Sequence, residues 1–377
     1  MLRRTFFAVA IATLSALVGT AAAEAQAFTV TDVAGREVSF DKPVERVILG
    51  EGRQIYFVSV LDTEDPFKRV VGWRDDVRTA DLDTWNEYLA KFPKMADIPV
   101  FGNLTDGTFQ TELAVSLKPD VLLLPLESKT PAEESKLFDT LDSIGVKVVF
   151  IDFRLEAFKN TEASMNILGQ LFGKEQRAAE FNAFRSAEIK RVTDVIEAKE
   201  PTEPLVFLER APGFFDECCA TFGDENFGRM VKLAGGHNLG TDILPGAQGM
   251  VSGEQIIAAN PDVYISTGSN WSQSAKPDGI WVGVGAGADL AAAKVKLAAL
   301  MDRPAFTGVK AKETGNVHAI WHQFYTNPFQ FVAIQQIAKW LHPELFADLD
   351  PDATFKELHE RFLPIAYKPG YWVSLND

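Results

Sequence analysis

Apolar positions along the chain alternate between short runs typical of buried strands and longer segments with helical spacing. The strand-like runs are Phe28–Val33, Arg36–Phe40, Arg46–Leu49, Val70–Gly72, Ile98–Phe101, Val121–Leu124, Lys147–Ile151, Leu205–Leu208, Val263–Ser266 and Val317–Trp321. The helix-like segments include Asp81–Phe92, Pro131–Ile144, Glu225–Ala234, Pro328–Leu341 and Thr354–Arg361. Because strands and helices alternate, the pattern predicts an α/β fold with parallel or mostly parallel sheets.

The middle of the chain predicts two consecutive helices, the second unusually long. Glu156–Phe172 ends at Gly173, a residue suited to a left-handed C-cap. Lys174–Ala198 then runs without Pro or Gly. Its apolar positions recur at steps of mostly three or four, and charged residues, Arg185 among them, are expected on the exposed faces. One apolar stripe is formed by Ala178, Phe181, Phe184, Ile189, Val192 and Ile196. We interpret this helix as a rigid connector between two lobes.

A duplicated unit flanks that connector. Glu112 is followed by Pro119-Asp120 and an apolar run, and Glu254 is followed at the same spacing by Pro261-Asp262 and a second apolar run. Each unit predicts a short helix, a break and a buried strand. The sequence therefore predicts two Rossmann-like lobes with central, mostly parallel sheets, joined by one long rigid helix. The expected division is residues 28–155, 156–199 and 200–377.

The N-terminus has the features of an export signal. Arg3 and Arg4 precede the apolar run Phe6–Val18, which is shorter than the roughly 20 residues that a membrane-spanning helix needs. Small residues follow, and we expect residues 1–27 to be cleaved after Ala27. The predicted destination is a bacterial periplasm. The formal net charge of −15 argues against a nucleic-acid partner.

Several short motifs, in this order along the chain, resemble periplasmic binding proteins of the iron-siderophore/cobalamin class, which deliver ligands to ABC importers. The motifs are Asp32-Val-Ala-Gly-Arg36, Pro43-Val-Glu-Arg46, the two Glu…Pro-Asp units, Ala234-Gly-Gly-His-Asn-Leu-Gly240 and Trp340-Leu-His-Pro343. The resemblance implies capture of a ferric siderophore, an anionic iron chelate, between two lobes and delivery to the transmembrane subunits of an ABC permease. It also implies that Glu112 and Glu254 dock that permease. We expect a monomer without a resident cofactor or protein-bound metal, because the iron travels inside the chelate.

Loops that follow the predicted strands nominate the residues that contact the ligand, since ligands bind beyond the carboxyl ends of strands in open α/β sheets. Three such loops carry an Arg, whose planar fork binds anionic oxygens, although each Arg also has an acidic neighbour. Aromatic side chains could form flat walls, although many aromatics belong to the core instead. The predicted ligand-binding residues are Arg53, Trp73, Arg74, Glu127, Arg210, Phe214, Phe215, Trp271, Trp321 and Tyr325.

The adjacent residues Cys218 and Cys219 allow a disulfide in an oxidising compartment or two buried thiols. Two sulfurs without a neighbouring His fall short of a four-ligand metal site. A thiol–disulfide enzyme is an alternative, but such enzymes use a C-x-x-C spacing, so we expect no catalysis. Receptors for haem, bound through Tyr325 or His322, or for cobalamin remain alternatives of the same fold.

Overall fold

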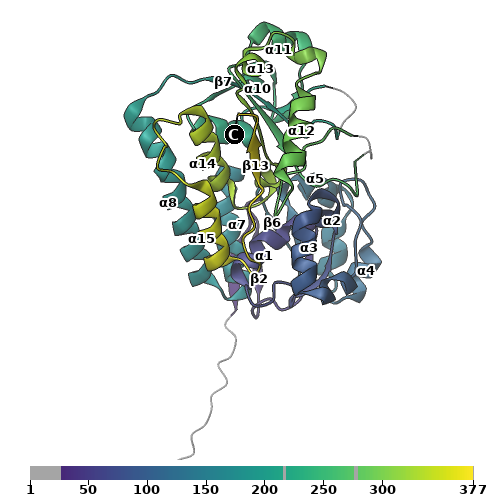
Figure 1. Cartoon of the computed structure of the whole chain (residues 1–377). Helices are drawn as coiled ribbons and strands as arrows, with labels where there is room; N and C mark the ends of the chain where they lie inside the picture. The colour runs from purple at the N-terminus through teal and green to yellow at the C-terminus, as the bar shows by residue number, and fades with distance from the viewer. Residues whose placement is uncertain (1–26, 215–217, 276–278, 377) are drawn as a thin grey trace, which may run out of the picture.

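Two β-sheets, one in each half of the chain, form the centres of two lobes (Figure 1). The computed structural model describes residues 27–214, 218–275 and 279–376. The N-terminal sheet has the order β4–β3–β5–β6, and all its neighbouring strands are parallel. A separate hairpin precedes it, β1 (Phe28–Thr31) with β2 (Glu37–Phe40). The sheet consists of β3 (Val47–Leu49), β4 (Val70–Trp73), β5 (Val121–Pro125) and β6 (Lys147–Ile151).

The C-terminal sheet is parallel at its centre and antiparallel at its edges. Its order is β10–β8–β7–β11–β12–β13, with β9 beside β7. Neighbouring strands are parallel where β7, β9, β11 and β12 meet, and antiparallel where β8, β10 and β13 join. The strands are β7 (Leu205–Glu209), β8 (Ala220–Phe222), β9 (His237–Asn238), β10 (Gln248–Met250), β11 (Val263–Gly268), β12 (Val317–Trp321) and β13 (Trp372–Ser374).

One long helix joins the two lobes. Helix α7 (Ala157–Phe172) ends at Gly173, which has a φ of 64°, and α8 (Glu175–Lys199) then runs for 25 residues. Along its length α8 packs against α1 (Ile55–Leu61) of the first lobe and α9 (Phe227–Leu233) and α14 (Gln330–Leu341) of the second (Figure 1). The predicted two-lobed α/β fold with one long connecting helix is confirmed.

The remaining helices cover the two sheets. Two predicted elements differ from the structure. The helix expected over Pro131–Ile144 is broken where Lys136 adopts a left-handed φ of 55°, and the strand expected over Ile98–Phe101 is reduced to one bridge at Val100. The helices not yet named are α2 (Asp76–Ala80), α3 (Leu82–Lys91), α4 (Thr111–Ser116), α5 (Lys129–Glu134), α6 (Leu137–Asp142), α10 (Leu239–Ile243), α11 (Gly253–Ala259), α12 (Leu290–Leu300), α13 (Lys310–Thr314) and α15 (Pro351–Phe362).

The connecting helix buries one charge that the sequence pattern places on an exposed face. Arg185 is only 5% exposed, and its guanidinium lies 5.9 Å from the centre of the Phe158 ring. Burial lowers the pKa of Arg185 to about 10. The prediction that Arg185 is exposed was wrong. Helical periodicity identifies one apolar face of α8, but it does not show that α7 and its neighbours also cover part of the remaining surface of α8.

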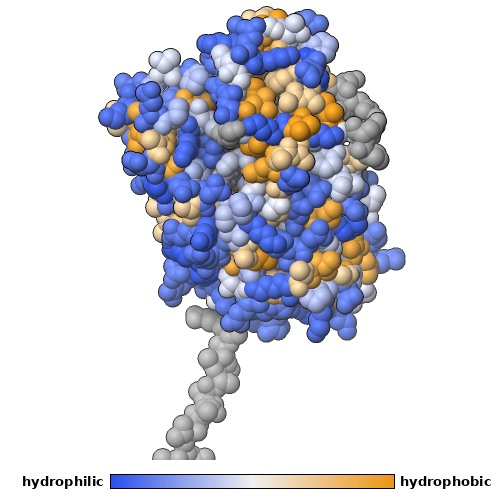
Figure 2. All heavy atoms as spheres, viewed as in Figure 1, coloured by the Kyte–Doolittle hydropathy of each residue, from blue (hydrophilic) through white to orange (hydrophobic). Residues whose placement is uncertain are grey.

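The face of the molecule shown in Figure 2 is mainly hydrophilic, with apolar side chains gathered over α12 in its upper part. Leu290 and Val295 of that helix are 36% and 70% exposed. Among the residues that the structure describes, no helix combines the length and apolarity needed to cross a bilayer. The predicted signal segment, residues 1–27, lies almost wholly outside the described residues.

A buried histidine in the C-terminal sheet makes stability depend on pH. Burial lowers the pKa of His318 from 6.5 to about 3, and its ring stacks on Trp340 at 4.3 Å. Below pH 6.5 the unfolded chain therefore binds a proton that the folded chain does not, and stability falls as pH falls.

We expect His318→Gln to reduce the pH dependence of the unfolding free energy by up to about 1.4 kcal/mol per pH unit between pH 6 and 4. Urea unfolding of both proteins at several pH values measures the difference. The other titrating groups contribute equally to both proteins. If the unfolding free energy changed with pH by the same amount in both, the prediction would be contradicted.

Candidate functional site

A cavity of about 200 Å³ lies between the lobes, where the carboxyl ends of strands from both sheets meet. Arg53 follows β3 of the first lobe, whereas Arg210, Trp271 and His322 follow β7, β11 and β12 of the second. Domain interfaces and the ends of parallel strands are favoured positions for ligand sites. The lining residues are Arg53, Thr79, Ala80, Arg210, Ala211, Phe214, Trp271, Ser274, His322, Gln323 and Tyr325.

Two guanidinium groups flank the ring of Tyr325. The central carbons of Arg53 and Arg154 each lie 5.6 Å from the ring centre. Arg53 Nη1 also donates a hydrogen bond of 2.9 Å to the Tyr325 hydroxyl, which links the first lobe to the second. The buried carboxylate of Glu51 forms ion pairs with both arginines. Tyr325 is therefore held between two cations at the lobe interface.

Further carboxylates fix the two guanidinium planes. Asp76 Oδ2 accepts a hydrogen bond of 2.8 Å from Arg53 Nε, and Glu127 Oε1 accepts one of 2.8 Å from Arg154 Nη1. Burial raises the pKa of Glu51, although Arg154 and Arg53 oppose the shift. Such paired arginines are preorganised, so little side-chain entropy is lost when they contact a ligand.

A glycine allows this cluster to form. The backbone N–H of Gly52 donates a hydrogen bond of 2.7 Å to Asp76 Oδ1. A Cβ atom at position 52 would lie 1.8 Å from the carbonyl oxygen of Arg74. Only glycine permits this close approach of the loops that follow β3 and β4, and the approach places Asp76 beside Arg53.

His322 contributes an uncharged imidazole to the cavity. Its Nδ1 atom lies 2.8 Å from Thr267 Oγ1, and its ring lies 4.5 Å from that of Tyr325. Burial holds the pKa of His322 well below its usual range, and the charges of Arg210, Arg53 and Arg154 lower it further. The neutral ring can donate or accept one further hydrogen bond beside the two lining arginines, Arg53 and Arg210.

The second lobe supplies an aromatic wall and also caps a helix of the first lobe. Phe214 packs edge-on against Trp271 with ring centres 5.2 Å apart. Trp271 Nε1 and Gln323 Nε2 both donate to the carbonyl of Ala80, at 3.1 and 2.7 Å, and Ser274 Oγ donates to the carbonyl of Thr79 at 2.7 Å. These bonds satisfy carbonyls at the end of α2, which lack partners inside the helix.

The sequence-predicted site residues fall into three groups. Five of them line the cavity: Arg53, Arg210, Phe214, Trp271 and Tyr325. Glu127 reaches the site through Arg154, and Arg74, which lies 3.9 Å from Asp76, does not line the cavity. Trp73 and Trp321 are buried in the core, where Trp73 stacks on Trp85 and Trp321 packs against Tyr371. Phe215 lies outside the described residues.

Sequence reasoning missed Arg154 as a site residue and did not commit to His322. Arg154 lies in the loop between the strand predicted over Lys147–Ile151 and the helix predicted from Glu156, so the strand-end rule covers it as it covers Arg53 after β3. His322 directly follows β12, and the same rule covers it.

The two predicted docking carboxylates are exposed, one on each lobe. Glu112 lies in the first turn of α4 and Glu254 in the first turn of α11. These helices occupy opposite ends of the molecule (Figure 1). Ser252 caps α11 through its hydroxyl, which accepts a hydrogen bond from the backbone of Gln255, and this fixes the direction in which the helix begins.

The adjacent cysteines form a disulfide just before β8, next to the strand that leads to Arg210. Cys219 is buried, and its backbone exchanges two hydrogen bonds with Val251. Cys218 is exposed. The pair therefore lies beside the ligand cavity without lining it.

Comparison with known proteins identifies the family. The sequence pattern of periplasmic binding proteins matches residues 78–322, and the chain belongs to that family, whose members serve ABC importers. The chain is 30% identical to FepB, a TroA-like periplasmic binding protein from Veillonella parvula, and the match covers 92% of this chain and 99% of that one. The two structures superpose with a TM-score of 0.83.

Other relatives share the fold but differ in their ligands. The molybdate-binding protein MolA of Haemophilus influenzae is 22% identical over 373 residues, which covers 90% of this chain and 92% of MolA. Its molybdate-bound structure gives a TM-score of 0.69. A periplasmic heme-binding protein from Pseudomonas aeruginosa is 17% identical, covering 80% of this chain and 94% of that one, with a TM-score of 0.56. These likenesses show the fold and leave the ligand of this chain open.

Proposed function

We propose that this periplasmic binding protein captures a ferric siderophore or a related anionic iron chelate and delivers it to an ABC permease. The supporting observation is the convergence of three guanidinium groups, those of Arg53, Arg154 and Arg210, around Tyr325 and His322 between the lobes. Guanidinium forks bind carboxylate and catecholate oxygens through charge-assisted hydrogen bonds. The function needs no covalent step and no resident cofactor.

The size of the cavity favours a compact ligand. About 200 Å³ is less than the roughly 300–1,000 Å³ that is common for small-molecule pockets. A compact chelate, or one anionic arm of a larger siderophore, suits this space. Haem and cobalamin, like a whole large siderophore, exceed this volume, so complete enclosure of any of them would need a wider separation of the lobes. In addition, the hydroxyl of Tyr325 already accepts a hydrogen bond from Arg53.

A free tetrahedral oxyanion such as molybdate is a second candidate. The same small volume and cationic lining suit it, and one relative, MolA, is a molybdate-binding protein. An oxyanion would contact the arginines, but it has no flat surface that could pack against aromatic side chains. The wall formed by Phe214 and Trp271 therefore favours the chelate.

A tryptophan-fluorescence titration of residues 28–377 tests both candidates. The chain contains seven Trp, and Trp271 lines the cavity. The panel comprises ferric catecholate, hydroxamate and citrate complexes, molybdate, tungstate, haemin and cobalamin. A thermal shift provides a second readout, because a ligand at 100 times its dissociation constant adds about 2.7 kcal/mol to stability.

The outcomes separate the candidates. Saturation by one class of ferric chelate, with no response to molybdate, supports the proposal. Saturation by molybdate or tungstate alone selects the second candidate. A response to haemin or cobalamin alone overturns the proposed siderophore-type ligand but keeps the importer role, whereas no response to any compound in the panel overturns the iron assignment. The mass of the exported protein tests the signal peptide, since cleavage after Ala27 leaves Phe28 as the first residue.

We also propose that Glu112 and Glu254 dock the permease. Their Ala variants should bind ligand like the wild type, and the double variant should lower uptake by cells at least tenfold. Each exposed pair contributes only about 0.2–1 kcal/mol, so the carboxylates act mainly on docking geometry and encounter rate. Glu357→Ala, which removes an exposed carboxylate from α15, is the control. Weakened ligand binding, or normal uptake by the double variant, would contradict this role.

A further inference from the structure

Two sulfur atoms and a carboxylate converge outside the ligand cavity. Cys218 and Cys219 precede β8, and Glu209 ends the neighbouring strand β7. The two sulfurs and one carboxylate oxygen of Glu209 all lie within 4.8 Å of one another. Within the described residues these three side chains meet the distance requirement for a shared metal ion. Sequence spacing gave only the two sulfurs, and the strand pairing adds the carboxylate.

We propose that the reduced form of this cluster binds a thiophilic divalent cation, such as Zn²⁺ or Cd²⁺, through Cys218, Cys219 and Glu209. Thiolate sulfur and carboxylate oxygen are both ordinary ligands of zinc, and a water molecule completes four-coordination. Two backbone hydrogen bonds to Val251, of 3.0 and 2.9 Å, hold Cys219 in place. Cys218 is exposed and opens the site to solvent.

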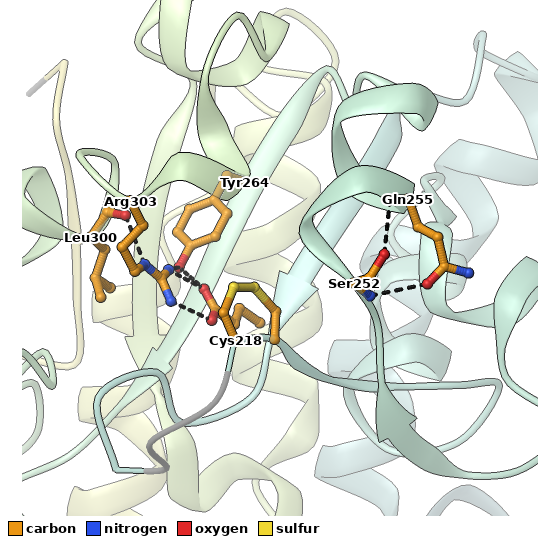
Figure 3. The surroundings of a disulfide bond; sticks show 8 residues. Cys218, Ser252, Gln255, Tyr264, Leu300 and Arg303 are labelled. Atoms are coloured by element: carbon orange, nitrogen blue, oxygen red, sulfur yellow. Dashed lines mark hydrogen bonds and ion pairs between the residues drawn. A yellow bond between two sulfur atoms is a disulfide. The ribbon is translucent and has the colours of Figure 1, made fainter.

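Glu209 is held in position for this role. Its Oε1 accepts a hydrogen bond of 2.8 Å from Arg303 Nη1, and its Oε2 accepts bonds of 2.5 Å from Arg303 Nη2 and from the Tyr264 hydroxyl. Figure 3 shows Cys218 close to Arg303 and Tyr264, the two residues that donate hydrogen bonds to Glu209. A carboxylate has about four lone-pair sites, so three hydrogen bonds leave one for a cation.

The charges also favour a divalent ion. Two thiolates and Glu209 carry three negative charges, and Arg303 supplies one positive charge. A divalent cation makes the cluster neutral, which lowers the cost of the negative charges on Glu209 and Cys219, the two buried members.

The site forms only after reduction, and the reaction balances. A phosphine reductant gives two electrons to the disulfide and becomes a phosphine oxide by taking oxygen from water. The two hydrogens of that water protonate the sulfurs. The cation then displaces both protons as the thiolates bind.

Anaerobic titration of the phosphine-reduced chain with Cd²⁺, after the reductant has been removed, tests the proposal. We expect one Cd²⁺ per chain, an ultraviolet thiolate-to-cadmium absorption band and release of about two protons per ion. The oxidised chain and the variant C218S/C219S should show none of these. Absence of the band in the reduced wild type, its persistence in C218S/C219S, or one ion per two chains would overturn the proposal.

A second comparison tests the carboxylate. Glu209→Gln alone leaves the Arg303 charge without its carboxylate and can destabilise the strand. The double variant E209Q/R303Q removes both charges together, so it is measured beside the single variant. Both proteins are first checked for cooperative melting. We expect E209Q/R303Q to bind Cd²⁺ at least tenfold more weakly than the wild type. Unchanged affinity would show that only the sulfurs bind, and it would overturn the three-ligand site.

Discussion

Replacing Arg303 with Ala is expected to lower the free energy of unfolding by about 3–5 kcal/mol. The reason is the environment of Glu209, which is 1% exposed and forms a bidentate ion pair with Arg303. Removing the cation leaves a buried carboxylate that still accepts a hydrogen bond from the hydroxyl of Tyr264, which is itself buried. One hydroxyl does not offset the cost of burying a full negative charge.

Urea unfolding measures this loss, and an exposed pair provides the control. Lys356 and Glu360 form an ion pair in which both side chains are more than 60% exposed. Lys356→Ala removes a cation in the same way but should cost only about 0–1 kcal/mol. Replacing Arg303 by Met together with Glu209→Gln should recover most of the loss, because no lone charge remains buried. Equal costs for Arg303→Ala and Lys356→Ala would contradict the prediction.

Much of the fold could be predicted because its signals are local. Alternating apolar runs indicate the strands, and Gly173 marks the end of α7. The two Glu…Pro-Asp units place α4 before β5 and α11 before β11, as observed. Short edge strands such as β10 and β13 were missed. Each is too short to show a clear alternation of apolar and polar residues, and its pairing is set by distant segments of the chain.

The candidate site could be predicted only in part, for a similar reason. The strand-end rule identifies which loops reach the cleft, and it placed Arg53, Arg210 and Tyr325 in the cavity wall. It does not determine whether a strand-end aromatic points into the cleft or into the core. Trp73 and Trp321 belong to the core because other aromatic rings enclose them, and those rings come from distant parts of the chain.

Replacing Arg210 with Gln is expected to weaken binding of the ferric chelate that saturates the wild type by about 10–150-fold. A hydrogen bond to a charged group contributes about 1.5–3 kcal/mol, which corresponds to that range. Arg210 lines the cavity, and burial lowers its pKa, so its charge is costly in the free protein. An anionic ligand offsets the cost of burying the Arg210 charge. A Gln side chain is uncharged, so it does not carry this cost and gains no charge-assisted hydrogen bond to the ligand.

Arg53 is less suited to this test. Arg53 also pairs with the buried carboxylates of Glu51 and Asp76, so its loss would mix folding with binding. Arg74→Gln is the matched control, since Arg74 follows a strand end but does not line the cavity. Calorimetric titration should give an affinity within twofold of the wild type for that variant. Equal losses for the two variants would mean that long-range charge, rather than contact with Arg210, governs affinity, because both substitutions remove one positive charge from the same cleft.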